Sequence, residues 1–91
     1  MNLLEESRSR INEIDHQLVK LFEERMHVVE NVARYKAENS LPVFDSSREK
    51  DNIEKNSATL EDQNLKKYFQ EWYRYTMEVS REYQKDILKR D

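Results

Sequence analysis

A cation in the middle of an apolar helical stripe is the feature of this sequence that points most directly to chemistry. Between Ile11 and Tyr35, apolar residues recur at steps of three and four, the spacing that places side chains on one face of a helix. Arg25 occupies the next position of that register after Leu21. Because an unpaired cation on a core-facing surface is costly to desolvate, we expect an anionic group to meet Arg25.

Two further cations lie on or beside the same stripe. Lys36 follows Arg25 by eleven residues, which is roughly 16 Å along a helix with a rotation of about 20°. Two such side chains could bracket a small dianion; alternatively, each pairs with a glutamate of a neighbouring helix. Arg8 precedes Arg25 by seventeen residues, or roughly 25 Å. Arg8 is therefore either a solvated residue or part of a site on another subunit.

The second half of the chain offers a further set of polar candidates. Asp45, Arg48 and Glu49 have the spacing Asp-x-x-Arg-Glu at an expected helix start. Asp45 would cap this helix, and the other two residues are either solvated or bind a carboxylate (Arg48) and a hydroxyl (Glu49). Ser80 and Gln84 are one turn apart and share a face of a later helix, as a polar surface turn or as part of a site.

Three helices are predicted to position these residues, so the fold class is all-α. Glycine is absent and helical periodicity is strong. The first helix should run from about residue 3 to 39 and end before Pro42, which excludes the preceding residue from the α region. A short helix should begin near residues 45–47 and end near 56–57. A long third helix is expected from about Leu60, with Thr59 and Asp62 as its capping signal.

Composition limits the classes of protein that remain. The 91 residues predict a single domain, 1–91, with a modest core, and the mean hydropathy of −1.12 favours an oligomer. A net charge of −3 with interspersed basic residues argues against nucleic acid, and no apolar run is long enough for a membrane span. Cysteine is absent and His16 and His27 are expected on the surface, so we predict no metal site and a cytoplasmic location. Several aromatic residues of the third helix are expected in the core or a dimer interface: Tyr68, Phe69, Trp72, Tyr73, Tyr75 and Tyr83.

Four ordered segments together carry a family resemblance. They are Arg8-x-x-Ile11-x-x-x-Asp15-x-x-Leu18-x-x-Leu21-x-x-x-Arg25, then Val32-Ala33-x-Tyr35-Lys36, Pro42-Val43-x-Asp45-x-x-Arg48-Glu49 and Ser80-x-x-x-Gln84. No single segment is specific, but the ordered set with its spacings is. The chain resembles the all-helical (AroQ-type) chorismate mutases over nearly its full length.

The resemblance implies a fold and a way of binding the substrate. The family fold is an intertwined homodimer, a helical bundle in which long first helices span both subunits and form two equivalent sites. Arg25 and Arg48 would bind the two substrate carboxylates, and Ser80 would contact a carboxylate. Arg8 would reach into the site of the partner subunit.

The resemblance also implies the reaction, the rearrangement of chorismate to prephenate in phenylalanine and tyrosine biosynthesis, by an isomerase that needs no cofactor. Lys36 and Gln84 would hydrogen-bond the ether oxygen of the breaking bond and, with Arg25, form the catalytic group. Glu49 would hold the ring hydroxyl, helped by the backbone near Asp45. Such residues suit a reaction that depends on conformational restriction and on stabilising negative charge at an oxygen.

Two alternatives and three departures accompany this interpretation. The alternatives are an isochorismate pyruvate lyase of the same fold and a non-catalytic helical dimerisation module; Glu49, suited to the chorismate hydroxyl, favours the mutase. The departures are the aromatic residues around Trp72, the amide of Asn52, where an apolar wall is expected, and the complete absence of glycine.

Overall fold

The computed structural model describes residues 2–90, which form three α-helices and one short 3-10 turn. The helices are α1 (Leu3–Glu38), α2 (Ser46–Ala58) and α3 (Lys66–Arg90), and the turn η1 (Gln63–Leu65) precedes α3. The predicted all-helical order of long, short and long helix is confirmed for the described part of the chain. No helix within it combines the length and the apolar character that crossing a membrane requires.

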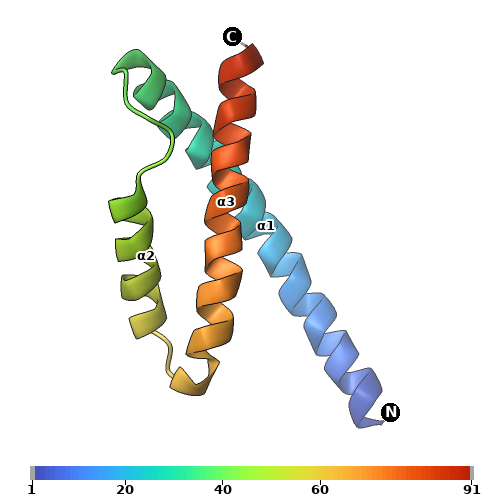
Figure 1. Cartoon of the computed structure of the whole chain (residues 1–91). Coiled ribbons are helices and arrows are strands. Elements are labelled where there is room, and N and C mark those ends of the chain that lie inside the picture. The colour runs from blue at the N-terminus through green and yellow to red at the C-terminus, as the bar shows by residue number, and fades with distance from the viewer. Residues whose placement is uncertain (1, 91) are drawn as a thin grey trace.

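Helix α3 lies beside both other helices and connects them (Figure 1). The C-terminal half of α1 crosses α3, whereas its N-terminal half extends away from the rest of the molecule (Figure 1). Every residue from 2 to 24 is accordingly exposed. The buried apolar residues are few and lie in the second half of α1 and in α3: Val29, Ala33, Met77 and Ile87. The core is therefore small, and a long arm of α1 stays exposed over the described residues.

The end of α1 is closed by a Schellman-type turn that lacks glycine. The Leu41 amide donates to the Lys36 carbonyl at 2.8 Å, and the Ser40 amide donates to the Ala37 carbonyl at 3.4 Å. Ser40 adopts a positive φ of 55°, the left-handed conformation that glycine favours at this position. This turn reverses the chain immediately after Lys36 and directs the following loop back toward that residue.

The connection between α2 and α3 corrects one prediction. Thr59 does not begin the third helix; it ends α2, and its hydroxyl donates to the Asn56 carbonyl at 2.7 Å. Asp62 caps the turn η1 instead, because its carboxylate accepts a hydrogen bond from the Asn64 amide at 3.0 Å. The Gln63 side chain also donates to the Ser57 and Leu60 carbonyls, which ties this loop to the end of α2. Helix α3 therefore begins at Lys66 rather than near Leu60.

Candidate active site

A polar cavity of about 200 Å³ lies where the three helices and the 39–45 loop meet. Apolar residues of α1, the loop and α3 form part of its wall: Val29, Val32, Val43 and Met77. Seven of the eight residues predicted for the site line it: Arg25, Lys36, Asp45, Arg48, Glu49, Ser80 and Gln84. Residues far apart in the sequence thus meet in one cavity of a single chain.

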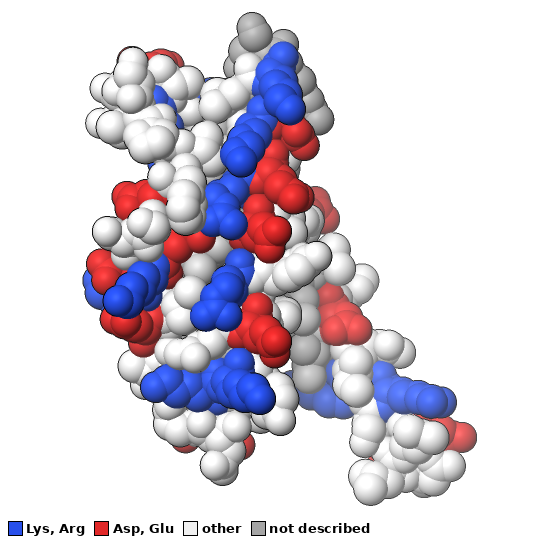
Figure 2. Space-filling model, in the orientation of Figure 1, with Lys and Arg blue, Asp and Glu red and all other residues white. Residues whose placement is uncertain are grey.

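Cations outnumber carboxylates around this cavity. Its lining holds four cations (Arg25, Lys36, Arg48 and Arg81) and two carboxylates (Asp45 and Glu49). On the face drawn in Figure 2, basic side chains follow one another along α3, with acidic side chains directly beside them. The cavity itself holds an excess of positive charge, which suits a small anion.

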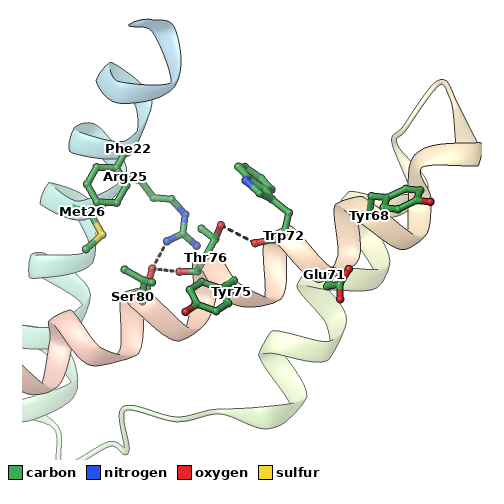
Figure 3. Close-up of a pocket in the computed structure, with 10 residues that line it drawn as sticks. Phe22, Arg25, Met26, Tyr68, Glu71, Trp72, Tyr75, Thr76 and Ser80 are labelled. Atoms are coloured by element: carbon green, nitrogen blue, oxygen red, sulfur yellow. Dashed lines mark hydrogen bonds between the residues drawn. The ribbon is translucent and has the colours of Figure 1, made fainter. Parts of the chain in front are cut away.

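Arg25 reaches from α1 to α3 and donates a hydrogen bond to the Ser80 hydroxyl (Figure 3). Ser80 is only 6% exposed, and its hydroxyl donates in turn to the Thr76 carbonyl at 3.0 Å. Within residues 2–90, Arg25 forms no ion pair with a carboxylate. Its charge is oriented by a neutral oxygen and remains available to an anion.

Lys36 is likewise held by a neutral oxygen, which belongs to the 39–45 loop. Its ammonium group donates to the Val43 carbonyl at 2.8 Å, across the reversal that follows α1. An ammonium group has three donors, and this contact uses one of them. Because a carbonyl carries no net charge, Lys36 also keeps an unneutralised charge at the cavity. The alternative in which Arg25 and Lys36 each pair with a glutamate is not found in the described part of the chain.

Gln84 lines the cavity and has a buried amide oxygen. The residue is 6% exposed, and its Oε1 atom has no hydrogen-bond partner among the described residues. Leaving such a group unpaired costs about 1–3 kcal/mol, so buried polar atoms are nearly always bonded. The oxygen and nitrogen of a side-chain amide can exchange places by rotation, so either can be offered to a ligand. Gln84 has the position and the free bonding capacity of a ligand-binding group.

Helix α2 supplies the remaining wall. Asp45 caps it, as predicted, and its Oδ1 atom accepts a hydrogen bond from the Arg48 amide at 3.1 Å. The side chain of Arg48 is exposed at the rim. Glu49 forms an ion pair with Arg81 of α3, in which Arg81 Nη1 lies 2.8 Å and 3.0 Å from the two carboxylate oxygens. Asn52, expected to replace an apolar wall residue, does line the cavity.

Two residues stand apart from the sequence-based site. Arg8 is exposed on the N-terminal part of α1 and does not line the cavity. Arg81 was not predicted, yet it lines the cavity. Its signal in the sequence was its place directly after Ser80 and three residues before Gln84, on the face that those residues share.

A larger and mostly apolar cavity, about 500 Å³, lies between α1 and α3 on the other side of Arg25 and Ser80. Figure 3 shows side chains of both helices around it, including Phe22, Trp72 and Tyr75. All three of these aromatic residues are exposed in the single chain. The larger cavity offers apolar contact area, whereas the smaller one gathers the charged and polar groups. The chemistry is therefore best assigned to the smaller cavity.

Comparison with known proteins adds two findings. A family model described as chorismate mutase type II matches residues 7–85. A bifunctional chorismate mutase/prephenate dehydratase of Buchnera aphidicola subsp. Acyrthosiphon pisum (strain APS) is 36% identical over 84 residues. That match covers 91% of this chain and 22% of the relative, so the chain spans about a fifth of that protein's length.

Proposed function

Because this chain belongs to the chorismate mutase type II family, we propose that it converts chorismate to prephenate. The observation that carries the proposal is the cavity in which seven residues expected from the family resemblance meet, with more cations than carboxylates. The match over residues 7–85 supports treating residues 1–91 as one domain. Prephenate leads to phenylalanine and tyrosine, so we assign the chain to aromatic amino acid biosynthesis. We also propose a cytoplasmic location, as expected of a biosynthetic enzyme of this kind.

The substrate is a flexible dianion that must be held in a compact, chair-like conformation. Arg25, oriented by Ser80, and Arg48 at the rim of α2 are the groups that would bind its two carboxylates. Arginine suits this role because its planar guanidinium can donate two parallel hydrogen bonds to a carboxylate. Glu49 would hold the ring hydroxyl by accepting a hydrogen bond from it, helped by the backbone near Asp45. Fixing both ends of the substrate removes much of the entropic barrier to an intramolecular reaction.

In the chemical step, the ether C–O bond breaks while a new C–C bond forms, with no nucleophile and no net transfer of protons. Negative charge grows on the ether oxygen as the bond breaks. The Lys36 ammonium and the Gln84 amide can donate hydrogen bonds to that oxygen, and both line the same cavity. Such preorganised donors stabilise the transition state more than the ground state, which is what accelerates the reaction.

We propose further that the active form is an intertwined homodimer. The chain exposes 7668 Å², roughly 2,000 Å² more than the ~5,700 Å² typical of a compact monomer of 11.2 kDa. An excess of this size matches the area that obligate homodimers bury per subunit. The exposed arm of α1 and the cavity beside Trp72 both offer apolar surface that a second copy could cover. In this dimer Arg8 would enter the partner's site, because it lies too far from Arg25 to share a site within one chain.

The test is to follow the loss of chorismate absorbance with purified protein, without added cofactor and with a chelator present. We expect prephenate to form at the same rate with and without chelator. Activity on isochorismate alone, with release of pyruvate, would instead support a lyase. If neither compound reacts and neither raises the melting temperature, the chain is better described as a helical dimerisation module.

A further inference from the structure

The ion pair between Glu49 and Arg81 joins α2 to α3 at the wall of the polar cavity. One guanidinium nitrogen of Arg81 contacts both carboxylate oxygens, at 2.8 Å and 3.0 Å, so the carboxylate has a defined orientation. The Arg81 and Glu49 side chains are 25% and 20% exposed, so the pair is largely withdrawn from water. By contrast, the ion pair of Arg10 and Glu13 lies within one helix and is about two-thirds exposed.

Arg81 also contacts the 39–45 loop, through the aromatic ring of Phe44. Its guanidinium carbon lies 4.6 Å from the centroid of the Phe44 ring, within the range of a cation–π contact. Phe44, Glu49 and Arg81 also line a shallow hollow of about 360 Å³, separate from the apolar cavity. Because Glu49 and Arg81 line both this hollow and the polar cavity, the ion pair forms a partition between the two.

A carboxylate in this cavity poses an electrostatic problem for a dianionic substrate. Glu49 is suited to accept a hydrogen bond from a hydroxyl, but its charge would repel both carboxylates of the substrate. Arg81 lies against that charge and offsets it while leaving the carboxylate at the cavity. An ion pair that is largely withdrawn from water has a desolvation cost that can cancel its Coulomb gain, so stability alone does not account for an arginine held by both Glu49 and Phe44.

We propose that Arg81 is a positioning residue for Glu49 that orients its carboxylate toward the substrate hydroxyl and offsets its charge. The proposal rests on the proposed chorismate mutase function. It implies that Arg81 acts through Glu49, and that it affects substrate binding more than the chemical step, because no bond to the hydroxyl oxygen breaks or forms in the rearrangement.

The first measurement is steady-state kinetics of Arg81→Ala and Arg81→Lys. We expect Arg81→Ala to raise KM about tenfold while kcat falls less than about threefold, the pattern of a lost interaction that is equal in ground and transition states. Arg81→Lys keeps the charge but loses the guanidinium geometry, so its KM should lie between that of the wild type and that of Arg81→Ala. Arg34→Ala is the control, since Arg34 is exposed on α1 and lines neither the two cavities nor the hollow. Its kinetics should match the wild type, and circular dichroism should show equal helicity for all variants.

The second measurement is a double-mutant cycle with Glu49→Gln. A neutral glutamine needs no counter-charge, so Arg81→Ala should change KM less than about twofold in that background. If Arg81→Ala costs the same factor with Glu49 and with Gln at this position, or leaves KM unchanged, Arg81 does not act through Glu49 and the proposal is overturned. Either result would leave the proposed function intact in an active wild type. Failure of the wild-type chain to convert chorismate would overturn the proposed function and this proposal together.

Discussion

Arg25 and Lys36 share a mode of support that explains how cations can be placed in a helical core. Each donates to a neutral oxygen, the Ser80 hydroxyl in one case and the Val43 carbonyl in the other. Such partners satisfy part of the hydrogen-bonding capacity and fix the side chain without cancelling its charge. A carboxylate partner would fix the side chain equally well, but it would have to be displaced by an incoming anion. The neutral partners thus preorganise the site for a dianion.

Arg25→Ala should therefore reduce kcat/KM by about a hundredfold or more, because it removes a preorganised charge from the site. The helical circular dichroism spectrum and the oligomeric state in solution should stay as in the wild type. Arg34→Ala provides the control, since Arg34 is exposed nine residues later on the opposite face of α1. Near-normal turnover by the Arg25 variant would contradict the assignment of the site.

Gln84→Glu should convert a flat pH profile into one that favours acid. An amide donates a hydrogen bond at any working pH, whereas a carboxyl group donates only when protonated. A glutamate ionises with a reference pKa near 4.3, so the variant should lose activity toward neutral pH and regain it as the pH falls. Turnover of both proteins between about pH 5 and 8 is the measurement. Superimposed profiles would mean that Gln84 does not contact the ether oxygen.

At the scale of the helices, the turn after α1 places Lys36 and the loop that holds it. Ser40 occupies the left-handed position of this turn with a φ of 55°, although a β-carbon makes that conformation unfavourable by about 1–2 kcal/mol. The turn brings the loop back toward the end of α1, where the Val43 carbonyl accepts a hydrogen bond from Lys36.

Ser40→Gly should accordingly stabilise the protein by about 1 kcal/mol, because glycine adopts a positive φ without steric cost. Chemical denaturation at one fixed protein concentration measures the free energy of unfolding. Ser9→Gly, within α1, should instead destabilise by up to about 0.5 kcal/mol, since glycine weakens a helix interior more than serine does. A Ser40→Gly variant no more stable than the wild type would mean that the turn is not strained.

The elements were predictable where the signals were local. The spacing of apolar residues, the capping Asp45 and the stop before Pro42 gave α1 and α2 nearly to the residue. The start of α3 was wrong because Thr59 and Asp62 serve two different structures, the end of α2 and the turn η1. The Glu49–Arg81 ion pair could not be predicted, since it joins residues 32 positions apart whose meeting depends on how α2 packs on α3.

At the scale of the whole molecule, the described chain is long and thin, with extents of 55 × 27 × 15 Å. The exposed arm of α1 carries a series of apolar residues, including Ile11, Ile14 and Leu18. Contiguous apolar surface of this kind marks an interaction site in a water-facing protein. A second copy of the chain is the partner that the proposed dimer supplies.

The proposed dimer predicts complementation between two inactive variants. Arg8→Ala and Arg25→Ala homodimers should each be poorly active, while a mixed dimer should hold one complete site and one site that lacks both arginines. Random pairing makes half of the dimers mixed, so mixing and refolding should restore up to about a quarter of wild-type activity. Light scattering should give twice the 11.2 kDa chain mass. No recovery despite demonstrated subunit exchange would mean that Arg8 does not serve the partner's site.

The unbroken course of α1 also limits which changes in length this protein can tolerate. Arg8 and Arg25 are connected only by helix, so their separation and angular relation are set by the number of residues between them. One alanine inserted between Ile14 and Asp15 would turn Arg8 by about 100° relative to Arg25. An insertion scan should therefore find activity lost along this stretch while substitutions on its solvent side are accepted. During divergence, the arm should vary in composition but keep its length.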